Sequence, residues 1–325
     1  MKKQTKVLLI ISLILIAVGV AAFVGAMAVL SWDFGSIGGS GYETNTYEID
    51  DDFDSLSISL AADDISIRPA KDEKCSIECY ERKNAKRSAG VSDNTLEIKS
   101  EDKRSWFEWF TFFSSDSPKM TVYLPKKDYY ALSISTETGD ISITGGLTFG
   151  SVDITGATGD VYCGASVDGQ ESIMLSTGDI EIYDASAKGL DLETSTGRIA
   201  VGSVKCDGPL SVKVSTGDVE LTDIECSSMG STGSTGRIYM TDTTAKGSFN
   251  IERSTGDITL DRCDAEQLYI RTTTGDVRGV LLSEKVFTTN TSTGDVKVPT
   301  TTGGGVCDIT TSTGDIKMDI AEPKE

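Results

Sequence analysis

The residues with the most regular chemistry in this sequence are aspartates that follow a repeated Thr-Gly pair. A Thr-Gly pair followed by Asp or Arg occurs ten times, with Asp in eight copies and Arg in two, Arg198 and Arg237. If the copies stack as coils, neighbouring carboxylates lie about 4.8 Å apart and repel one another. We interpret the position as a solvated turn in which the two arginines relieve part of this repulsion. The alternative is a divalent-cation site, although the nine-residue calcium β-roll repeat is absent. Such a site would lie along Asp257, Asp276, Asp295 and Asp315.

The remaining chemically active residue types give little support to catalysis. Histidine is absent, which excludes Ser-His-Asp and Cys-His catalysis and most zinc sites. We therefore predict no catalytic residue, no metal, no cofactor and no enzymatic activity. The chain has seven cysteines and no Cys-x-x-Cys pair. Most fall in apolar or small-residue columns of the repeat, which indicates core packing. A disulfide between Cys206 and Cys226, in neighbouring coils, is the alternative.

A second group of candidates lies before the repeat, in a basic stretch (RKNAKRSAG) and a dense aromatic stretch (SWFEWFTFF). The basic stretch is interpreted as a loop that could contact lipid or a membrane protein. The aromatic cluster either packs into the core or cap, or forms an exposed tip that touches the bilayer interface. The candidates for contact with a partner or a membrane are Arg82, Lys83, Lys86, Arg87, Trp106 and Trp109.

A repeat across residues 131–320 must position the aspartates. The glycines of the Thr-Gly pairs are 19 or 20 residues apart, and Ile or Val lies two residues after each of them. Apolar and polar residues alternate within each copy, which is strand periodicity. Short strands at this fixed period predict an all-β parallel β-solenoid of about ten regular coils. A small-residue column nine residues after the glycine contains Ala187, Cys206, Cys226, Ala245 and Ala265.

Residues 46–130 are expected to form an irregular β cap at the N-terminal end of this solenoid. The segment DISI at residues 64–67 resembles the repeat without its glycine. Asp63 lies 76 residues before Gly139, close to four coil lengths. The solenoid is therefore predicted to begin near residue 50, with irregular first coils and an inserted loop.

The N-terminus predicts a membrane anchor. Residues 1–6 are basic, and residues 7–30 contain no charge and are long enough for one transmembrane helix. Residues 31–45 then form a flexible linker and residues 321–325 a tail. Lysines before the helix place the N-terminus in the cytoplasm and the β-domain outside the plasma membrane. Cleavage as a signal peptide is the alternative. The net charge of −20 in 325 residues argues against nucleic acid as a partner.

These features together resemble a known family. An N-terminal apolar helix, the DISI segment, the strand TVYLP, the segment ALSISTETGDISI and the repeated STGDI or STGDV blocks are similar to the bacterial putative-adhesin family of β-strand-repeat domains of unknown function. The resemblance covers roughly residues 45–320. It implies a cell-envelope location and, for some members, a link to envelope stress. It implies no catalytic residues.

The function predicted first is that of a non-enzymatic cell-surface solenoid, an adhesin or an envelope-binding scaffold. Its partners would be the membrane, through the N-terminal helix, and a wall polymer or an envelope protein. The alternative is an envelope-stress accessory protein that contacts the membrane or a membrane sensor. A polysaccharide-acting β-helix enzyme is less favoured, because the uniform coil length leaves no room for cleft-building loops. A polymer-forming structural protein is less favoured because of the membrane helix.

Overall fold

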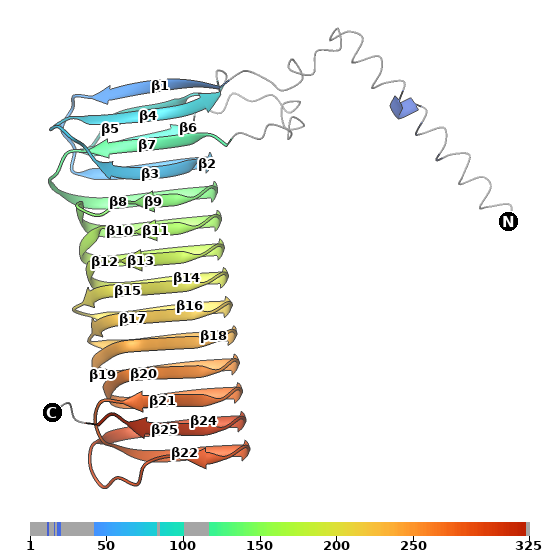
Figure 1. Ribbon diagram of the computed structural model, residues 1–325. Coiled ribbons are helices and arrows are strands. Elements are labelled where there is room, and N and C mark those ends of the chain that lie inside the picture. Colours follow the sequence, from blue (N-terminus) through green and yellow to red (C-terminus); the bar gives the residue numbers. More distant parts are fainter. Residues whose placement is uncertain are drawn as a thin grey trace.

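The chain folds into a long rod of stacked β-strands, as the computed structural model shows (Figure 1). The structure describes residues 12, 16, 18–20, 42–82, 85–100 and 117–322. These residues form 25 strands, most of them paired in parallel with the strands of neighbouring coils. The predicted all-β parallel solenoid is therefore confirmed.

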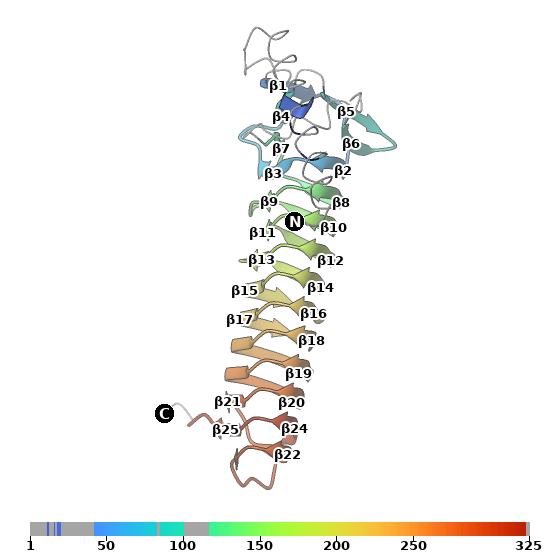
Figure 2. The ribbon, with the colours of Figure 1, turned by 90° about the vertical axis from the view of Figure 1, so that its right-hand side faces the viewer.

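A regular coil contains one strand on each of two opposite faces, which Figure 2 shows side by side. Strands of the same face pair in parallel from coil to coil. The first face contains β8 (Asp128–Thr138), β10 (Thr148–Thr158), β12 (Ser166–Thr177), β14 (Ser186–Thr196), β16 (Pro209–Thr216), β18 (Ser228–Thr235), β22 (Lys285–Thr293) and β24 (Gly305–Thr313). The second contains β9 (Ile141–Ile143), β11 (Val161–Cys163), β13 (Ile180–Tyr183), β15 (Ile199–Cys206), β17 (Val219–Cys226), β21 (Val277–Leu281), β23 (Val296–Lys297) and β25 (Ile316–Ile320). Two long strands run from the second face onto the first, β19 (Ile238–Thr255) and β20 (Ile258–Thr274).

The repeated glycine forms the corner between the two faces because no other residue fits there. At Gly217 the φ angle is +144°, and an added Cβ would lie 1.8 Å from the carbonyl oxygen of Gly197 in the neighbouring coil. Its N–H donates to the carbonyl oxygen of Thr235 at 2.9 Å. All ten repeated glycines have a positive φ. The corner therefore needs both the left-handed backbone and the bare Cα that glycine supplies.

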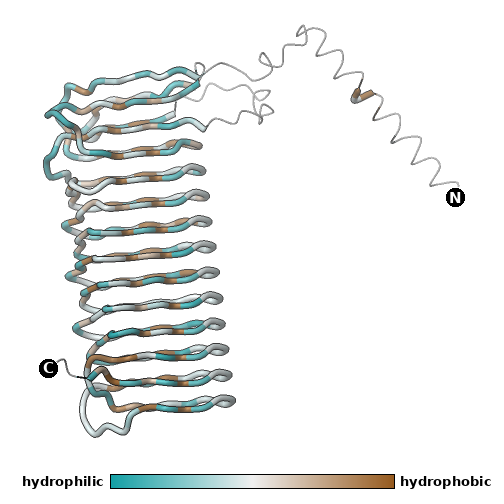
Figure 3. The backbone as a smooth tube through the Cα atoms, in the orientation of Figure 1, coloured by the Kyte–Doolittle hydropathy of each residue, from teal (hydrophilic) through white to brown (hydrophobic). Residues whose placement is uncertain are grey.

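The apolar columns face inward and form one continuous core. Ile134, Ile154 and Ile173, in successive coils, are at most 1% exposed. Their positions are in register across β8, β10 and β12. Figure 3 shows the same alternation of hydrophobic and hydrophilic residues along the rod. Because one coil cannot bury these columns alone, stability comes from stacking.

The first coil of the solenoid contains β2 (Ser55–Ala62) and β3 (Asp64–Pro69), which stack on β8 and β9. Ile65 pairs with Ile141 across the 76-residue spacing. An added Cβ at Gly139 would lie 2.2 Å from the carbonyl oxygen of Asp63, so Asp63 takes the corner position of this coil. The 76 residues from Asp63 to Gly139 therefore do not form four stacked coils, and that interpretation is wrong. The coil of β2 and β3 lies directly on the coil of β8 and β9.

The residues between these two coils belong to the cap. Its strands are β1 (Tyr42–Ile49), β4 (Cys75–Arg82), β5 (Arg87–Ser92), β6 (Thr95–Ser100) and β7 (Lys119–Leu124). β6 and β7 continue the parallel stacking on β2 and β3. Beyond them the pairing becomes antiparallel, through β5 with β6, β4 with β7 and β1 with β4. The parallel solenoid therefore ends in two antiparallel edges at the cap.

The last two coils do not follow sequence order. β24 and β25 lie between the coil of β20 and β21 and the coil of β22 and β23. The N–H of Gly275 donates to Thr313, and the N–H of Gly314 donates to Thr293. Sequential stacking, implied by the predicted Asp ladder, is wrong here. The corners of the two copies share the sequence STGD, and the copy that contains Thr289 lies at the end of the rod.

The predicted N-terminal helix falls mostly outside the described residues, although residues 12, 16 and 18–20 are helical. Within the part of the chain that is described, no helix has the length and apolar character needed to span a bilayer.

Candidate functional site

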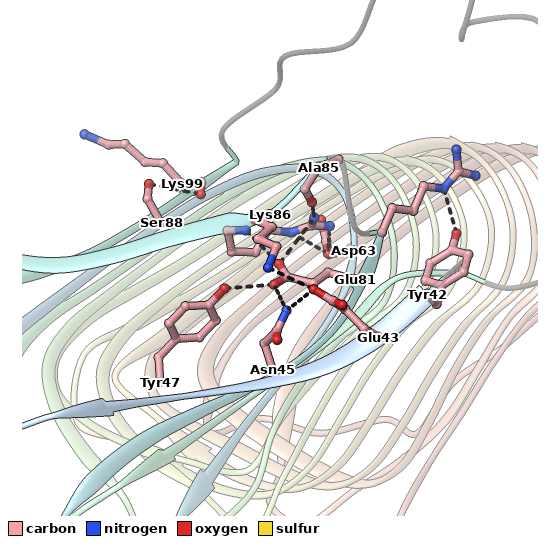
Figure 4. A network of polar contacts seen from close by, with 12 residues as sticks. Tyr42, Glu43, Asn45, Tyr47, Asp63, Glu81, Ala85, Lys86, Ser88 and Lys99 are labelled. Carbon is pink, nitrogen blue, oxygen red and sulfur yellow. Dashed lines mark hydrogen bonds and ion pairs between the residues drawn. The ribbon is translucent and has the colours of Figure 1, made fainter. Parts of the chain in front are cut away.

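The six contact candidates of the cap region are placed only in part. Lys83, Trp106 and Trp109 lie outside the described residues. The other three lie where β4 turns back into β5, a connection much shorter than the loop expected from the basic stretch. They join a network of polar contacts at the top of the rod (Figure 4).

Arg87 does not lie on the surface, contrary to its prediction as a contact residue. Its side chain is only 6% exposed and forms an ion pair with Asp63. Its backbone N–H donates to Glu81 Oε2 at 2.7 Å, and its Nη1 lies 3.9 Å from the same oxygen. Burial raises the pKa of Asp63, and the charge of Arg87 opposes that rise. Arg87 thus fastens the cap to the first coil.

The second carboxylate oxygen of Glu81 is also satisfied within the cap. Glu81 Oε1 accepts hydrogen bonds from Asn45 Nδ2 at 2.7 Å and from the hydroxyl of Tyr47 at 2.8 Å (Figure 4). Burial and the hydrogen bond to Glu81 raise the pKa of Tyr47. This network joins β1 to β4 and the first coil, so its role is structural.

The remaining two basic candidates already have partners on β1. Arg82 Nε donates to the hydroxyl of Tyr42 at 3.1 Å, and its guanidinium carbon lies 5.5 Å from the centre of that ring. Lys86 Nζ lies 2.9 Å from Glu43 Oε1, and its side chain is about half exposed. Their contacts hold the cap together and leave a smaller cationic surface than the sequence indicates.

The corner aspartates form a hydrogen-bonded ladder. The N–H of Asp160 donates to Asp140 Oδ1 at 2.9 Å, and the N–H of Asp179 donates to Asp160 Oδ1 at 2.8 Å. Each carboxylate therefore binds the next corner, which explains why Asp recurs at this position. At the far end the ladder runs Asp257, Asp276, Asp315 and Asp295. Among the described residues no group of three or more Asp, Glu, Cys or His is placed to hold a metal ion.

The two arginines of the ladder lie against carboxylates. Arg198 Nη1 lies 3.1 Å from Glu220, and its Nη2 forms an ion pair with Glu181. Arg237 Nη2 lies 2.8 Å from Asp218. Hydrogen bonds from Arg237 lower the pKa of Asp218 despite its partial burial. These contacts agree with charge relief at a solvated turn.

A groove on the side of the rod is the strongest candidate for a binding site. It has a volume of about 460 Å³ and lies where the chain returns from the second face to the first. Its floor is the small-residue column, at Cys206, Cys226, Ala245 and Ala265. These side chains are 2% to 9% exposed. Because small residues follow one another across neighbouring coils, the floor is continuous along the rod.

Charged residues border this floor on both sides. Lys205, Glu225 and Asp264 precede floor residues, whereas Asp207, Lys246 and Glu266 follow them. At the distal end, Lys285 Nζ lies 2.6 Å from Asp264 Oδ1. Both signs therefore border the groove, with acidic residues in the majority. The small-residue floor was predicted from the sequence, but the two rows of charged residues beside it were not. The signal for these rows was the charged residue next to each small residue.

The thiols of the floor are unsuited to nucleophilic chemistry. Burial raises the pKa of Cys226 to about 12 and also raises that of Cys206. Both thiols stay protonated near neutral pH, and a thiol is a poor nucleophile compared with a thiolate. All seven cysteines are buried and free, so they are core residues and the alternative Cys206–Cys226 disulfide is wrong.

The coil, its glycine corner and its aspartate ladder define a parallel β-solenoid repeat protein. The Toastrack DUF4097 family matches residues 53–209 and 205–325. These ranges cover most of the chain, so the chain belongs to the Toastrack DUF4097 family, and the predicted resemblance is confirmed. No curated protein matches the chain.

Several solved structures are similar to the chain. A putative adhesin from Bacteroides fragilis is 14% identical, with a TM-score of 0.40, over 86% of this chain and 98% of that chain. A putative adhesin from Parabacteroides distasonis is 12% identical, with a TM-score of 0.46, over 86% and 98%. A putative lipid binding protein from the same species is 13% identical, with a TM-score of 0.43, over 87% and 97%.

Proposed function

We propose that this chain is a non-enzymatic cell-envelope rod that binds an extended wall polymer in its side groove. Its N-terminal segment holds it at the plasma membrane, and the β-domain projects outward. The observation that carries the proposal is the continuous small-residue floor between two rows that contain both acidic residues and lysines. A floor of this kind accommodates a thin, extended chain lying along the rod.

The mixed charges of the two rows define the class of ligand. A purely anionic polymer would meet Glu225, Asp264 and Glu266, and a purely cationic one would meet the lysines. A strand with amide groups and charges of both signs can pair with both rows. The peptide-bearing glycan of the cell wall has this chemistry, so we propose it as the ligand class.

The envelope-stress alternative has less support. Of the four basic candidates, Arg87 is buried, Lys86 is paired with Glu43, and Arg82 lies on Tyr42. These three described candidates therefore give anionic lipid less cationic surface than the sequence indicates. Membrane vesicles serve as the comparison in the experiment below. Because the N-terminal segment alone would bind them, only vesicle binding that Arg82→Glu with Lys86→Glu weakens would revive this alternative.

The test is co-sedimentation of the purified full chain, in mild detergent, with isolated cell walls. Lys205→Glu with Lys246→Glu reverses the cationic part of the groove at exposed positions. Lys317→Glu, on an exposed position of β25 outside the groove, is the matched control. We expect the wild type and the control to pellet with walls and the double variant to remain in solution. Equal pelleting of all three proteins would refute the groove as the binding site.

Binding to vesicles without binding to walls would refute the wall polymer as the ligand. Any release of soluble sugar or peptide from the walls by the wild type would refute the non-enzymatic assignment. The polymer-forming alternative predicts that the chain sediments by itself, so a sample without walls is included.

A further inference from the structure

The distal end of the rod is an open strand edge. Within the part of the chain that the structure describes, β22 pairs only with β24, and β23 pairs only with β25. Figure 1 shows β22 at the end of the rod opposite the cap. The hydroxyl of Thr301, in the loop after β23, donates to the carbonyl oxygen of Lys285 at the start of β22. From Val286 onward, the side of β22 that faces away from β24 has no strand partner in the described chain.

The composition of this edge favours strand pairing. Residues 286–293 (VFTTNTST) are mostly β-branched and carry no charge. Lys285 is only 4% exposed and is bound to Asp264, so its charge does not prevent another strand from pairing with this edge. Natural edge strands are commonly protected by exposed lysine, proline or a bulge. Of the two strands at this end, β23 has the exposed Lys297 and is followed by Pro299, whereas β22 has none of these devices. The edge of β22 is therefore a ready template for another strand.

Exposed apolar side chains gather at the same end. Leu282, Val286, Val296 and Val306 are 42% to 46% exposed. They belong to the last two coils and the turn that leads into them. Four large apolar side chains in so small a region indicate a surface that a partner covers.

The cap end differs in both respects. β1 is bordered by Glu43, Glu48 and Asp50, and the chain before it leads to the predicted anchor. Joining the distal end of one rod to the cap of the next would therefore place a neutral edge against a charged one. A distal end is similar in charge and apolar character only to another distal end. A contact between two such ends uses both of them, so the assembly stops at a dimer.

We propose that two copies of this chain pair through their distal ends, with β22 of one copy antiparallel to β22 of the other. A two-fold axis perpendicular to the rod reverses the strand direction, so that two identical edges exchange backbone hydrogen bonds. The same axis brings the apolar side chains of both ends together. The pair is one straight rod of twice the length, with a cap at each outer end.

This arrangement can join two facing membranes. If each cap lies toward a membrane, the paired rods bridge two cells of the same kind. That placement rests on the proposed function, whereas the pairing itself does not. Many weak contacts between facing membranes add up to strong attachment because each bound pair raises the effective concentration of the others.

The test uses the full chain in detergent micelles, without cell walls. Sedimentation equilibrium over a range of concentrations measures the dissociation constant. Val286→Lys with Val296→Lys places two charges at the distal end on exposed positions. Met174→Lys, at a side chain that is 43% exposed on β12, is the matched control. We expect a monomer–dimer equilibrium that the double variant weakens at least tenfold and the control leaves unchanged. Electron micrographs should show straight rods of doubled length.

Several results would overturn the proposal. A wild type that stays monomeric at all concentrations would do so. Dimers that resist both valine substitutions would place the contact elsewhere, for example in the N-terminal segment. Chains of three or more rods would show that the contact does not close. Because no wall polymer is present, a failure here leaves the groove experiment unaffected, and the reverse also holds.

Discussion

Replacing Glu171 by Gln should remove a pH-dependent loss of stability. Glu171 is fully buried in β12, in a column that other coils fill with residues such as Val152 and Leu190. Neither of its carboxylate oxygens has a hydrogen-bond partner in the described chain. Burial raises its pKa from 4.5 to about 7, and the nearby Cys163 thiol opposes only part of that rise.

The magnitude follows from this difference in pKa between the folded and unfolded chain. About 2.5 pKa units at about 1.4 kcal/mol each give about 3 kcal/mol. Because the folded-state pKa is the raised one, the unfolded chain loses its proton first. The free energy of unfolding is therefore highest below about pH 4.5, falls as the pH rises to about 7, and stays level above that.

Urea denaturation of the full chain, followed by circular dichroism at a series of pH values, tests this reasoning. Gln has nearly the volume of Glu and does not ionise, so Glu171→Gln should match the wild type near pH 4.5. Near pH 8 it should be more stable by about 3 kcal/mol. Glu252→Gln, at an exposed position of β19, is the matched control and should show no such divergence. A constant difference between Glu171→Gln and wild type at all pH values would refute the argument.

Three further predictions follow from the corners and the cap. Asp160→Ala should lower the free energy of unfolding by about 1 kcal/mol, because it removes the hydrogen bond from the N–H of Asp179. Asp160→Asn should keep that hydrogen bond. Equal losses for both variants in urea titrations would contradict this prediction. Gly217→Ala should prevent formation of the native rod, because its Cβ would overlap a carbonyl oxygen; a native circular dichroism spectrum and melting temperature would count against it. Arg87→Met should destabilise the chain by about 3–5 kcal/mol, because the buried carboxylate of Asp63 loses its ion-pair partner. Lys86→Met, at an exposed pair, should change thermal stability little, and similar effects of both substitutions would disprove the buried role.

The solenoid could be predicted from the sequence because its determinants are local and repeated. The corner needs glycine, and the two-residue alternation places Ile154 and Ile173 inward in every copy. The order of the last two coils could not be predicted in this way. Corners with the same STGD sequence fit at either level, so their order depends on which copy tolerates an open end. Thr289 gives no signal of this order, because the equally polar Ser231 occupies the same column in the middle of the rod.

The candidate site was predictable only in its floor. The column of Cys206 and Ala245 was visible because small residues recur at a fixed distance from the glycine. A charged residue stands beside each small residue, but its sign and side follow no period, so the charge pattern of the groove could not be predicted from the repeat. Arg87 was misjudged because a basic run normally lies in solvent, whereas the fold turns it toward Asp63, 24 residues earlier. A long-range ion pair of this kind leaves no mark in the local pattern.

Hydrogen–deuterium exchange of the full chain with solubilised wall fragments tests the central claim most directly. We predict slower exchange on addition of fragments in peptides covering residues 205–207, 225–227, 244–246 and 264–266, which border the groove floor. Peptides containing the glycine corners should be unchanged, because the corners are not part of the groove. Protection confined to the corners or the cap, or no protection anywhere at saturating fragment concentrations, would contradict the account.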